Sequence, residues 1–348
     1  MSLLLAADIG GTKSVLAVFD LQGDLRSAPL VQGIYASRNF SGILELVSTF
    51  LGETGHVPEY ACLAVAGVVG NGQAEMTNLP WMIRASLVAE RFGFAGVWLI
   101  NDLTAVCSSL PLLQEDDCLE LQTGQEIPGG VRAVIAPGTG LGEGFLAQTG
   151  EVIWAQGTEG GHADFAPTDA TQAALLDWKR RQHPWSVPIS YEMLCSGLGI
   201  PTLYAFFKAS GMEEAPAVRA ALATVGDQTP VIVNGALDGE NPCLVCRKTI
   251  ELFLTILGAE AGNLALKLYS TGGLYIGGGI MLHLAGRISF APLLAAFNNK
   301  EKMAALMATI PVRMITRKDA ALLGAASYGA AMVSSSCATM QQASADGM

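Results

Sequence analysis

The sequence predicts an α/β protein whose sheets are mixed, with both parallel and antiparallel neighbours. Two apolar segments, Leu3–Asp8 and Ser14–Asp20, are typical of strands, and the turn IGGT between them predicts a hairpin in which glycine permits positive φ. Residues Ser41–Phe50 carry apolar side chains at helical spacing, with Ser41 as the expected cap. Asn71-Gly72 between apolar flanks indicates a second hairpin. Hairpins combined with helical crossovers indicate the α/β class.

The remaining elements of the N-terminal third follow the same pattern. Ala61–Ala66 is expected to be a strand, and Arg84–Phe92 a helix closed by the glycine that follows it. Val97–Ile100 is expected to be a buried strand. This last strand runs directly into two polar residues, Asn101 and Asp102.

A second strand-and-glycine unit begins near residue 131. Val131–Ala136 is expected to be a strand that opens into the turn PGTGLGEG, and Gly144–Gln148 and Val152–Ala155 are expected to form a hairpin about Gly150. The segments 3–18 and 131–147 therefore look like two versions of one strand-and-glycine-turn unit.

The C-terminal half is expected to contain a long buried helix. Asn241-Pro242 has the pattern of an N-cap followed by proline, and the sequence is apolar nearly all round from there to Leu268. A strand at Val312–Ile315 and a last helix at Ala320–Val333 complete the expected order. The polar segment 334–348 is expected to be loose.

Length and charge narrow the class of protein. The chain has 348 residues and a formal net charge of −11, with 51% hydrophobic and 15% charged residues. This composition is globular, and the length suggests two domains. The acidity argues against nucleic acid as a partner, because the surface would repel a phosphate backbone. The seven cysteines and the lack of a basic leader lead us to expect reduced thiols, a cytoplasmic location and no membrane association.

The glycine turns are the first candidates for chemistry. The sequence contains neither G-x-x-x-x-G-K-[ST] nor G-x-G-x-x-G, so the two common nucleotide-binding signatures are absent. Two glycine turns remain, one at Asp8–Thr12 and one at Pro137–Gly144. Such turns can present backbone N–H groups to phosphate oxygens, and Asp8 could hold Mg²⁺ through water. Each turn alone could also be a plain hairpin turn, but the matching Gly-Thr chemistry of the pair favours phosphate binding.

Six motifs together carry a family resemblance. DIGGTK, LINDL, APGTGLGEG, EGGHADFAP, YEMLCSGLGI and IGGGI occur in this order. The chain thereby resembles the bacterial-type glucokinases of the sugar kinase and actin-like ATPase superfamily, over about residues 3–330. The resemblance implies a two-lobed, ribonuclease H-like fold with a cleft between the lobes. It also implies transfer of the γ-phosphoryl group of ATP to the 6-hydroxyl of glucose, the first step of glycolysis, by a homodimer.

The resemblance assigns roles to the sugar-binding motifs. Asp102 would be the general base that accepts the proton of the 6-hydroxyl, and Asn101 would bind a ring hydroxyl. Glu159, His162 and Glu192 would complete the hydroxyl contacts. Alternatives from the residues alone are that Asp102 caps a helix and that Glu159 and His162 belong to a polar surface loop.

The resemblance also assigns the nucleotide-binding residues. The phosphates would be bound by Ala7, Asp8, Ile9, Gly10, Gly11, Thr12, Gly138, Thr139 and Gly140. Gly278 and Gly279 would lie near the adenosine, unless they form a strand end packed against a helix. Mg²⁺ would accompany ATP, with Asp8 as a water-mediated ligand.

Domain limits and alternatives complete the expectations. One lobe would be 1–111 plus 318–333, and the other 112–317. The alternatives to a glucokinase are a kinase for another hexose, such as fructose, mannose or a hexosamine, or a sugar-sensing protein without catalysis.

Cys243 and Cys246 form a CxxC pair, but both fall at the start of the apolar helix and no second ligand pair is near, so we expect buried thiols and no zinc. The zinc segment CxCGxxGC of the related repressor, kinase and open-reading-frame family does not follow His162.

Overall fold

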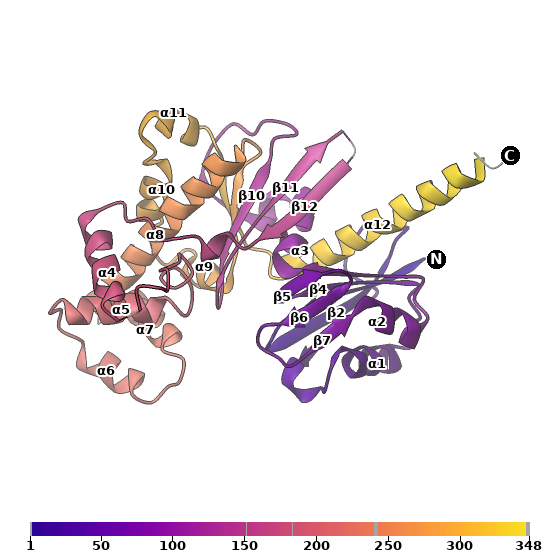
Figure 1. Ribbon diagram of the computed structural model, residues 1–348, viewed down its shortest axis with the longest axis horizontal. Coiled ribbons are helices and arrows are strands. Elements are labelled where there is room, and N and C mark those ends of the chain that lie inside the picture. The colour runs from indigo at the N-terminus through magenta and orange to yellow at the C-terminus, as the bar shows by residue number, and fades with distance from the viewer. Residues whose placement is uncertain (1, 151, 183, 240–242, 346–348) are drawn as a thin grey trace. The chain divides into compact units, whose positions relative to one another are not determined.

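The structure is a computed structural model that describes residues 2–150, 152–182, 184–239 and 243–345, with side chains as far as residue 335. The chain divides into two compact units (Figure 1). Unit 1 comprises Met1–Gln114, Ile153–Gly157 and Arg317–Met348. Unit 2 comprises Glu115–Val152 and Thr158–Thr316.

Unit 1 is built on a mixed five-stranded sheet of order β3-β2-β1-β4-β8. Its strands are β1 (Leu3–Ile9), β2 (Lys13–Asp20), β3 (Val31–Ala36), β4 (Tyr60–Val65) and β8 (Gly96–Asn101). β1 is antiparallel to β2 and parallel to β4, and β4 is parallel to β8. The expected hairpin and the mixed sheet are therefore confirmed, and the carboxyl ends of β1, β4 and β8 share one edge.

The turn between β1 and β2 needs glycine for a different reason from the expected one. Neither Gly10 nor Gly11 has a left-handed φ, so the expectation of positive φ is wrong. A Cβ on Gly10 would instead lie 2.9 Å from the carbonyl oxygen of Lys13, and one on Gly11 would lie 2.7 Å from Cβ of Asn78. Close approach of neighbouring chain, and not backbone conformation, therefore selects glycine here.

The alternation of β1 divides the core of unit 1 between two faces of the sheet. Leu5, Ala7 and Ile9 pack with α1 (Ile43–Thr54), while Leu4 and Ala6 pack with α12 (Ala320–Ala345). The helices α2 (Ala85–Phe92) and α3 (Asp102–Ser109) and a small sheet of β5 (Gly67–Gly70), β6 (Gln73–Met76) and β7 (Met82–Arg84) complete the unit.

Local turn chemistry in unit 1 is partly as expected. Asn71 and Gly72 both have positive φ, of 51° and 70°, between β5 and β6, which confirms the second hairpin. The expected cap at Ser41 is wrong, because Gly42 occupies the N-cap position of α1. Ser41 instead donates from its backbone N and its hydroxyl to the Glu45 carboxylate, both at 2.7 Å.

The last helix, α12, returns to unit 1 and closes it (Figure 1). A Cβ on Gly324 would overlap the carbonyl oxygen of Ala105 in α3, and one on Gly329 would lie 2.8 Å from Leu4 in β1. The helix continues to Ala345 and does not end at Val333, so the expected loose segment is helical over 334–345. The sequence there has no glycine or proline before Gly347 to stop a helix.

Unit 2 repeats the strand order of unit 1 and adds one strand. Its sheet has the order β12-β11-β10-β13-β14-β9. The strands are β9 (Cys118–Gln122), β10 (Arg132–Pro137), β11 (Leu141–Thr149), β12 (Val152–Thr158), β13 (Leu274–Ile276) and β14 (Val312–Ile315). Of β12, the residues Ile153–Gly157 are counted with unit 1. β10 is antiparallel to β11 and parallel to β13, as β1 is to β2 and β4. The two strand-and-glycine units are thus equivalent hairpins in two similar sheets.

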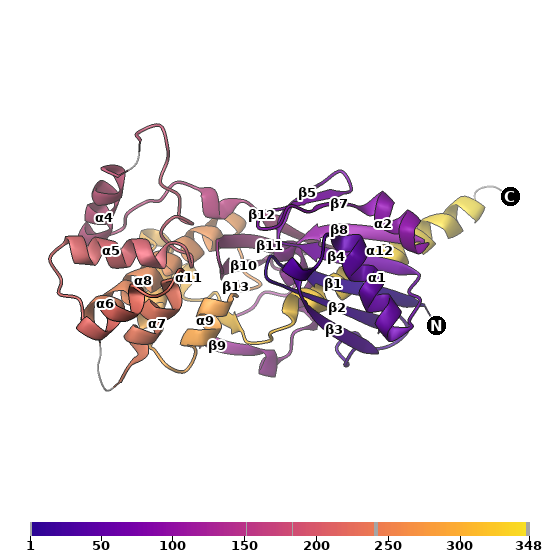
Figure 2. The ribbon, with the colours of Figure 1, turned by 90° about the horizontal axis from the view of Figure 1, so that it is seen from below.

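The helix α8 (Leu244–Leu268) is the core axis of unit 2, packed beside α5 and α7 (Figure 2). The other helices are α4 (Ala170–Arg180), α5 (Ile200–Ala209), α6 (Pro216–Leu222), α7 (Thr229–Leu237), α9 (Gly279–Leu284), α10 (Ala291–Asn298) and α11 (Ala304–Met307). Among the described helices, α8 alone has the length and hydropathy of a membrane span, but 78% of that window is buried within the protein. It is therefore a core helix, as expected.

The start of α8 differs from the expected cap. The pair Asn241-Pro242 lies outside the described residues, and the helix begins at Leu244 with Cys243 as its N-cap. The Cys243 thiol accepts a hydrogen bond from the backbone N–H of Cys246 at 3.5 Å. Both thiols are buried, which confirms that part of the interpretation of the CxxC pair.

Candidate active site

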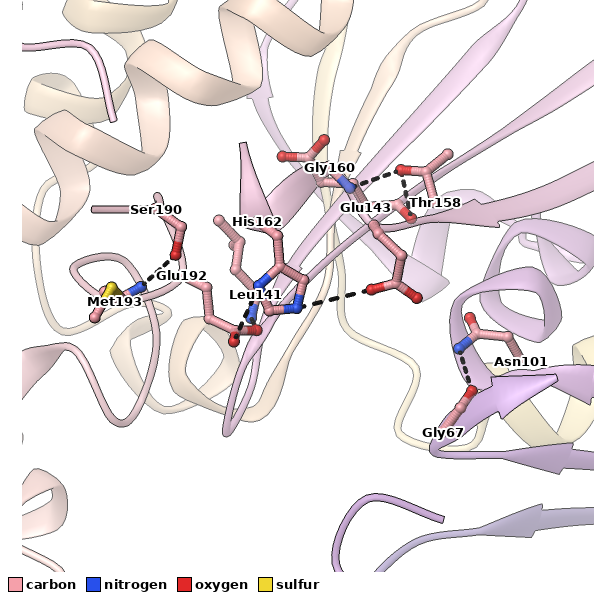
Figure 3. Close-up of polar contacts among 11 residues, drawn as sticks. Gly67, Asn101, Leu141, Glu143, Thr158, Gly160, His162, Ser190, Glu192 and Met193 are labelled. Atoms are coloured by element: carbon pink, nitrogen blue, oxygen red, sulfur yellow. Dashed lines mark hydrogen bonds and ion pairs between the residues drawn. The ribbon is translucent and has the colours of Figure 1, made fainter. Parts of the chain in front are cut away.

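In unit 1, Asn101 and Asp102 stand where β8 passes into α3. Asn101 is the N-cap of the helix: its Oδ1 accepts from the N–H of Leu103 at 2.8 Å, and its Nδ2 donates to the carbonyl of Gly67 at 3.2 Å (Figure 3). The alternative in which Asp102 is the cap is therefore corrected, because Asp102 is the first residue of the helix. Its Oδ1 accepts from the same N–H at 3.0 Å. A Cβ on Gly157 would lie 2.5 Å from Asn101 Oδ1, so a larger residue there would displace the capping amide.

Asp8 lies near the end of β1 with an unusual charge environment. Burial and the negative charge of Asp102 raise the pKa of Asp8 to about 6, while Lys13 opposes the rise. Two carboxylates that repel each other suit a divalent cation, which would relieve the repulsion. Among the described residues no group of three or more His, Cys, Asp or Glu side chains is placed to hold a metal ion. One or two carboxylates with phosphate and water ligands are the usual partners of Mg²⁺, so Asp8 fits that ion.

In unit 2, three predicted sugar ligands gather around one short turn. His162 ends the 3₁₀ turn Gly160–His162, and its Nε2 lies 3.8 Å from Oε2 of Glu159. Its Nδ1 lies 3.8 Å from Oε1 of Glu192 (Figure 3). Both distances exceed a hydrogen bond, so the two ring nitrogens remain available to a ligand. The imidazole is 61% exposed and can be reached from solvent.

The start of β11 holds this group together. The backbone N–H of Leu141 donates to Oε2 of Glu192 at 2.9 Å (Figure 3). A Cβ on Gly140 would overlap the same carboxylate oxygen, and a Cβ on Gly161 would overlap the carbonyl oxygen of Leu141. The backbone N–H of Glu192 also donates to the carbonyl of Gly161 at 2.9 Å. Three segments far apart in sequence thus depend on glycine for their contact.

The second glycine turn lines a separate pocket of unit 2, with a volume of about 480 Å³. Its lining residues are Gly138, Thr139, Gly197, Leu198, Asp227, Thr229, Pro230, Val233, Asn234, Gly279, Ile280 and His283. The predicted nucleotide residues Gly138, Thr139 and Gly279 therefore share one pocket. Gly278, the N-cap of α9, precedes Gly279 and has a φ of 97°, and a Cβ there would overlap the carbonyl oxygen of Pro137.

Two polar residues of this pocket were missed in the sequence. His283 Nε2 lies 2.9 Å from Oδ1 of Asn234, although His283 has no evident partner in the sequence. His283 belongs to α9 and Asn234 to α7. The two residues are 49 positions apart, so no local sequence pattern predicts their contact. Glu143 of β11 was also missed. The sequence did contain a signal for it, because Glu143 is the acidic residue of the motif GLGEG.

Two similar sheets, each carrying a glycine turn on its first hairpin, together with paired carboxylates and a polar His–Glu turn, define a sugar kinase of the actin-like ATPase fold. The glucokinase family model matches residues 5–332. The glucokinase of Nostoc punctiforme is 36% identical over 336 residues, covering 94% of this chain and 98% of that protein. The chain therefore belongs to the glucokinase family and is an ATP-dependent sugar kinase, a transferase.

Solved structures agree with this assignment. A glucokinase crystal structure from an Antarctic psychrotroph has a TM-score of 0.81 and 31% identity, covering 94% of this chain and 99% of that one. The glucokinase of Balamuthia mandrillaris in complex with glucose, at 22% identity and covering 94% of this chain and 93% of that one, has a TM-score of 0.75. That second likeness supports the fold alone.

Proposed function

We propose that this protein transfers the γ-phosphoryl group of ATP to the 6-hydroxyl of glucose, giving glucose 6-phosphate, with Asp102 as the general base. The observation that carries the proposal is the cluster of Glu159, His162 and Glu192 around the 3₁₀ turn Gly160–His162 of unit 2. Family membership adds support, since the relatives from Nostoc punctiforme and Nostoc sp. bear the name glucokinase.

Phosphoryl transfer requires little covalent chemistry from the protein. The oxygen of the 6-hydroxyl attacks the γ-phosphorus, the bond from phosphorus to the bridging oxygen of ADP breaks, and the hydroxyl proton passes to a base. Asp102 suits this step because its carboxylate stands at the N-terminus of α3, where the helix favours negative charge. Its task is to orient the hydroxyl and accept the proton as phosphorus–oxygen bonding develops.

Sugar recognition falls to side chains that can both donate and accept. Glu159 and Glu192 can accept from ring hydroxyls, and His162 can donate or accept through either ring nitrogen. Asn101 caps α3 through Oδ1 and donates to Gly67 through Nδ2, which leaves one amide hydrogen and one lone pair of Oδ1 for a ring hydroxyl. A site that pairs each hydroxyl rejects analogues that lack one, since a buried partner is then left unpaired.

For the nucleotide, the turns Asp8–Thr12 and Gly138–Gly140 would bind phosphate with backbone N–H groups. A chain of net charge −11 needs such local devices, because its overall field opposes an anion. The pocket that contains Gly138, Thr139 and Gly279 is of suitable size for a nucleoside. Mg²⁺, when bound, neutralises charge on the β- and γ-phosphates, and Asp8 would hold it through water.

The test is a coupled assay of the purified protein with a panel of hexoses and with ATP, ADP and polyphosphate as donors. We expect glucose with ATP to give the highest kcat/KM. Preference for fructose, mannose or a hexosamine would replace glucose as the substrate. Binding of sugar without turnover by any donor would contradict a kinase. Light scattering of the same sample tests the homodimer that we expect, and cell fractionation tests the cytoplasmic location.

A further inference from the structure

Glu143 is the third residue of β11 and is buried. Only 2% of its surface is exposed, and Leu141, two positions earlier, and Gly144, directly after it, are buried as well. Acidic side chains are rarely buried in this way without a partner. Oε1 of Glu143 makes no hydrogen bond with any of the described residues. The position therefore demands either a neutral carboxyl or an unusual stabilising contact.

The carboxyl of Glu143 lies directly against the sugar-binding turn. A Cβ on Gly160 would overlap Oε2 of Glu143, so the two groups are in contact. The hydroxyl of Thr158 donates to the backbone carbonyl of Glu143 at 3.4 Å and accepts from the N–H of Gly160 at 3.2 Å (Figure 3). Both the backbone and the side chain of Glu143 thus support the turn that carries Glu159 and His162.

The charges that face Glu143 come mainly from α8. Glu260 is fully buried, with Oε2 accepting from Asn263 Nδ2 at 2.8 Å and Oε1 paired with Lys267 Nζ at 3.3 Å. Lys300 donates to Asn263 Oδ1 at 2.6 Å and stands on the far side of that amide.

Lys267 pairs with Glu260 and Lys300 donates to Asn263, while Glu143 faces the Glu260 carboxylate. Burial and the charge of Glu260 raise the pKa of Glu143 to about 7, while Lys267 opposes the rise. The thiol of Cys195, whose pKa burial and both carboxylates raise, adds no compensating positive charge.

We propose that Glu143 is a positioning residue of the sugar site, whose neutral carboxyl supports the turn Glu159–His162 and whose ionisation weakens sugar binding. The inference rests on the proposed function, because it takes that turn as the sugar site. An ionised carboxylate with no donor must draw in water or move toward solvent. Either movement displaces Gly160, which touches it.

We expect the KM for glucose to rise with pH and the KM for ATP to show no such rise. If the sugar binds only to protein with neutral Glu143, a single ionisation near pH 7 raises the glucose KM by up to about tenfold between pH 6 and pH 8. A positioning role through sugar binding also predicts that kcat changes less than KM over this range.

The decisive variant is Glu143→Gln, which keeps the shape and is neutral at every pH. We expect its glucose KM to stay near the low-pH value of the wild type from pH 6 to pH 8. Every other ionisable group is present in both proteins, so the difference between their profiles isolates Glu143. The matched control is Glu251→Gln on the exposed side of α8, which should keep the wild-type profile. A Glu143→Gln profile that follows the wild type would overturn the inference.

Calorimetry of glucose binding without ATP tests the same idea on the unaltered protein. Titrations at pH 7.5 in two buffers of different ionisation enthalpy should show uptake of up to about 0.8 proton per glucose bound, because Glu143 must become neutral. Binding with no proton uptake would overturn the inference while leaving the kinase intact. Absence of both sugar binding and hexose phosphorylation would overturn the proposed function itself.

Discussion

Asp8 and Asp102 lie at the same edge of the first sheet. Ile9, directly after Asp8, pairs with Val65 of β4, and Val65 pairs in turn with Asn101, directly before Asp102. The phosphate turn and the proposed base are therefore held in register by one row of a parallel ladder. Their proximity is also visible in the pKa of Asp8, which burial and the charge of Asp102 raise to about 6.

The raised pKa of Asp8 makes stability depend on pH in an unusual direction. A carboxyl whose pKa is higher in the folded protein favours folding fully below its unfolded value of 3.8, and that stability is lost as pH rises through about 6. We expect Asp8→Asn, which is neutral throughout, to be more stable than the wild type at pH 7, by about 3 kcal/mol. The two proteins should be equally stable near pH 3.5. Urea unfolding at both pH values measures the difference.

Asp20→Asn is a matched control for this experiment. Asp20 ends β2 and caps a turn by accepting from the N–H of Gln22 at 3.0 Å. Its substitution should not reproduce the gain at pH 7. A wild type and an Asp8→Asn variant that differ by the same amount at both pH values would contradict the linkage. Despite its stability, Asp8→Asn should lose activity, because a neutral amide is a poor Mg²⁺ partner.

Asp102→Ala tests the proposed base. The carboxylate acts on the hydroxyl as it reacts, so kcat should fall by at least about 100-fold while the affinity for glucose changes little. The helix keeps its N-cap because Asn101 supplies it. Steady-state kinetics and calorimetry of glucose binding give the two numbers. If kcat stays above about a tenth of the wild type, equal to ~1.4 kcal/mol of barrier, Asp102 is not the base.

His162→Ala separates the sugar site from the nucleotide site. Loss of the imidazole should raise the KM for glucose by about tenfold or more and leave the KM for ATP nearly unchanged. His56→Ala is the control, since His56 lies after α1, outside the sugar turn, and its Nδ1 bonds to the carbonyl of Thr54 at 3.1 Å. Equal rises in both KM values would indicate that His162 merely packs its loop.

Gly161→Ala tests the contact between the sugar turn and β11. The added methyl group would overlap the carbonyl oxygen of Leu141, so the backbone must shift. We expect a loss of about 1–3 kcal/mol in the free energy of unfolding and a weaker affinity for glucose. Gly52→Ala in α1 has open space around its Cβ and should instead gain up to about 1 kcal/mol with unchanged kinetics. Chemical unfolding and glucose titration compare the two.

Much of the fold was predictable because its signals are local. The apolar run Leu3–Asp8, the pair Asn71-Gly72 and the apolar run to Leu268 are each local signals, and the strand, hairpin and core helix that they predict are present. The starting residues of helices were harder to predict from the sequence. Ser41 has the chemistry of a cap, yet the chain enters α1 through Gly42 and the serine bonds to Glu45 instead.

The contacts between distant segments could not be derived from local pattern. Glu192 meets the N–H of Leu141 across 51 positions, and Asn234 meets His283 across 49. The family resemblance suggested the first group, since Glu192 belongs to a motif that it shares. The pocket pair belongs to no motif, and the role of Glu143 becomes visible only when its burial and its contact with Gly160 are known.

The return of α12 to unit 1 has a consequence for biosynthesis. One face of the first sheet is covered by Leu322, Ala325 and Ala326 of that helix, packed against Leu4 and Ala6. During translation these partners leave the ribosome more than 300 residues apart, after all of unit 2 has been made. The nascent chain therefore carries an uncovered apolar sheet face for most of its synthesis, and a message truncated before α12 would yield a protein in need of chaperones.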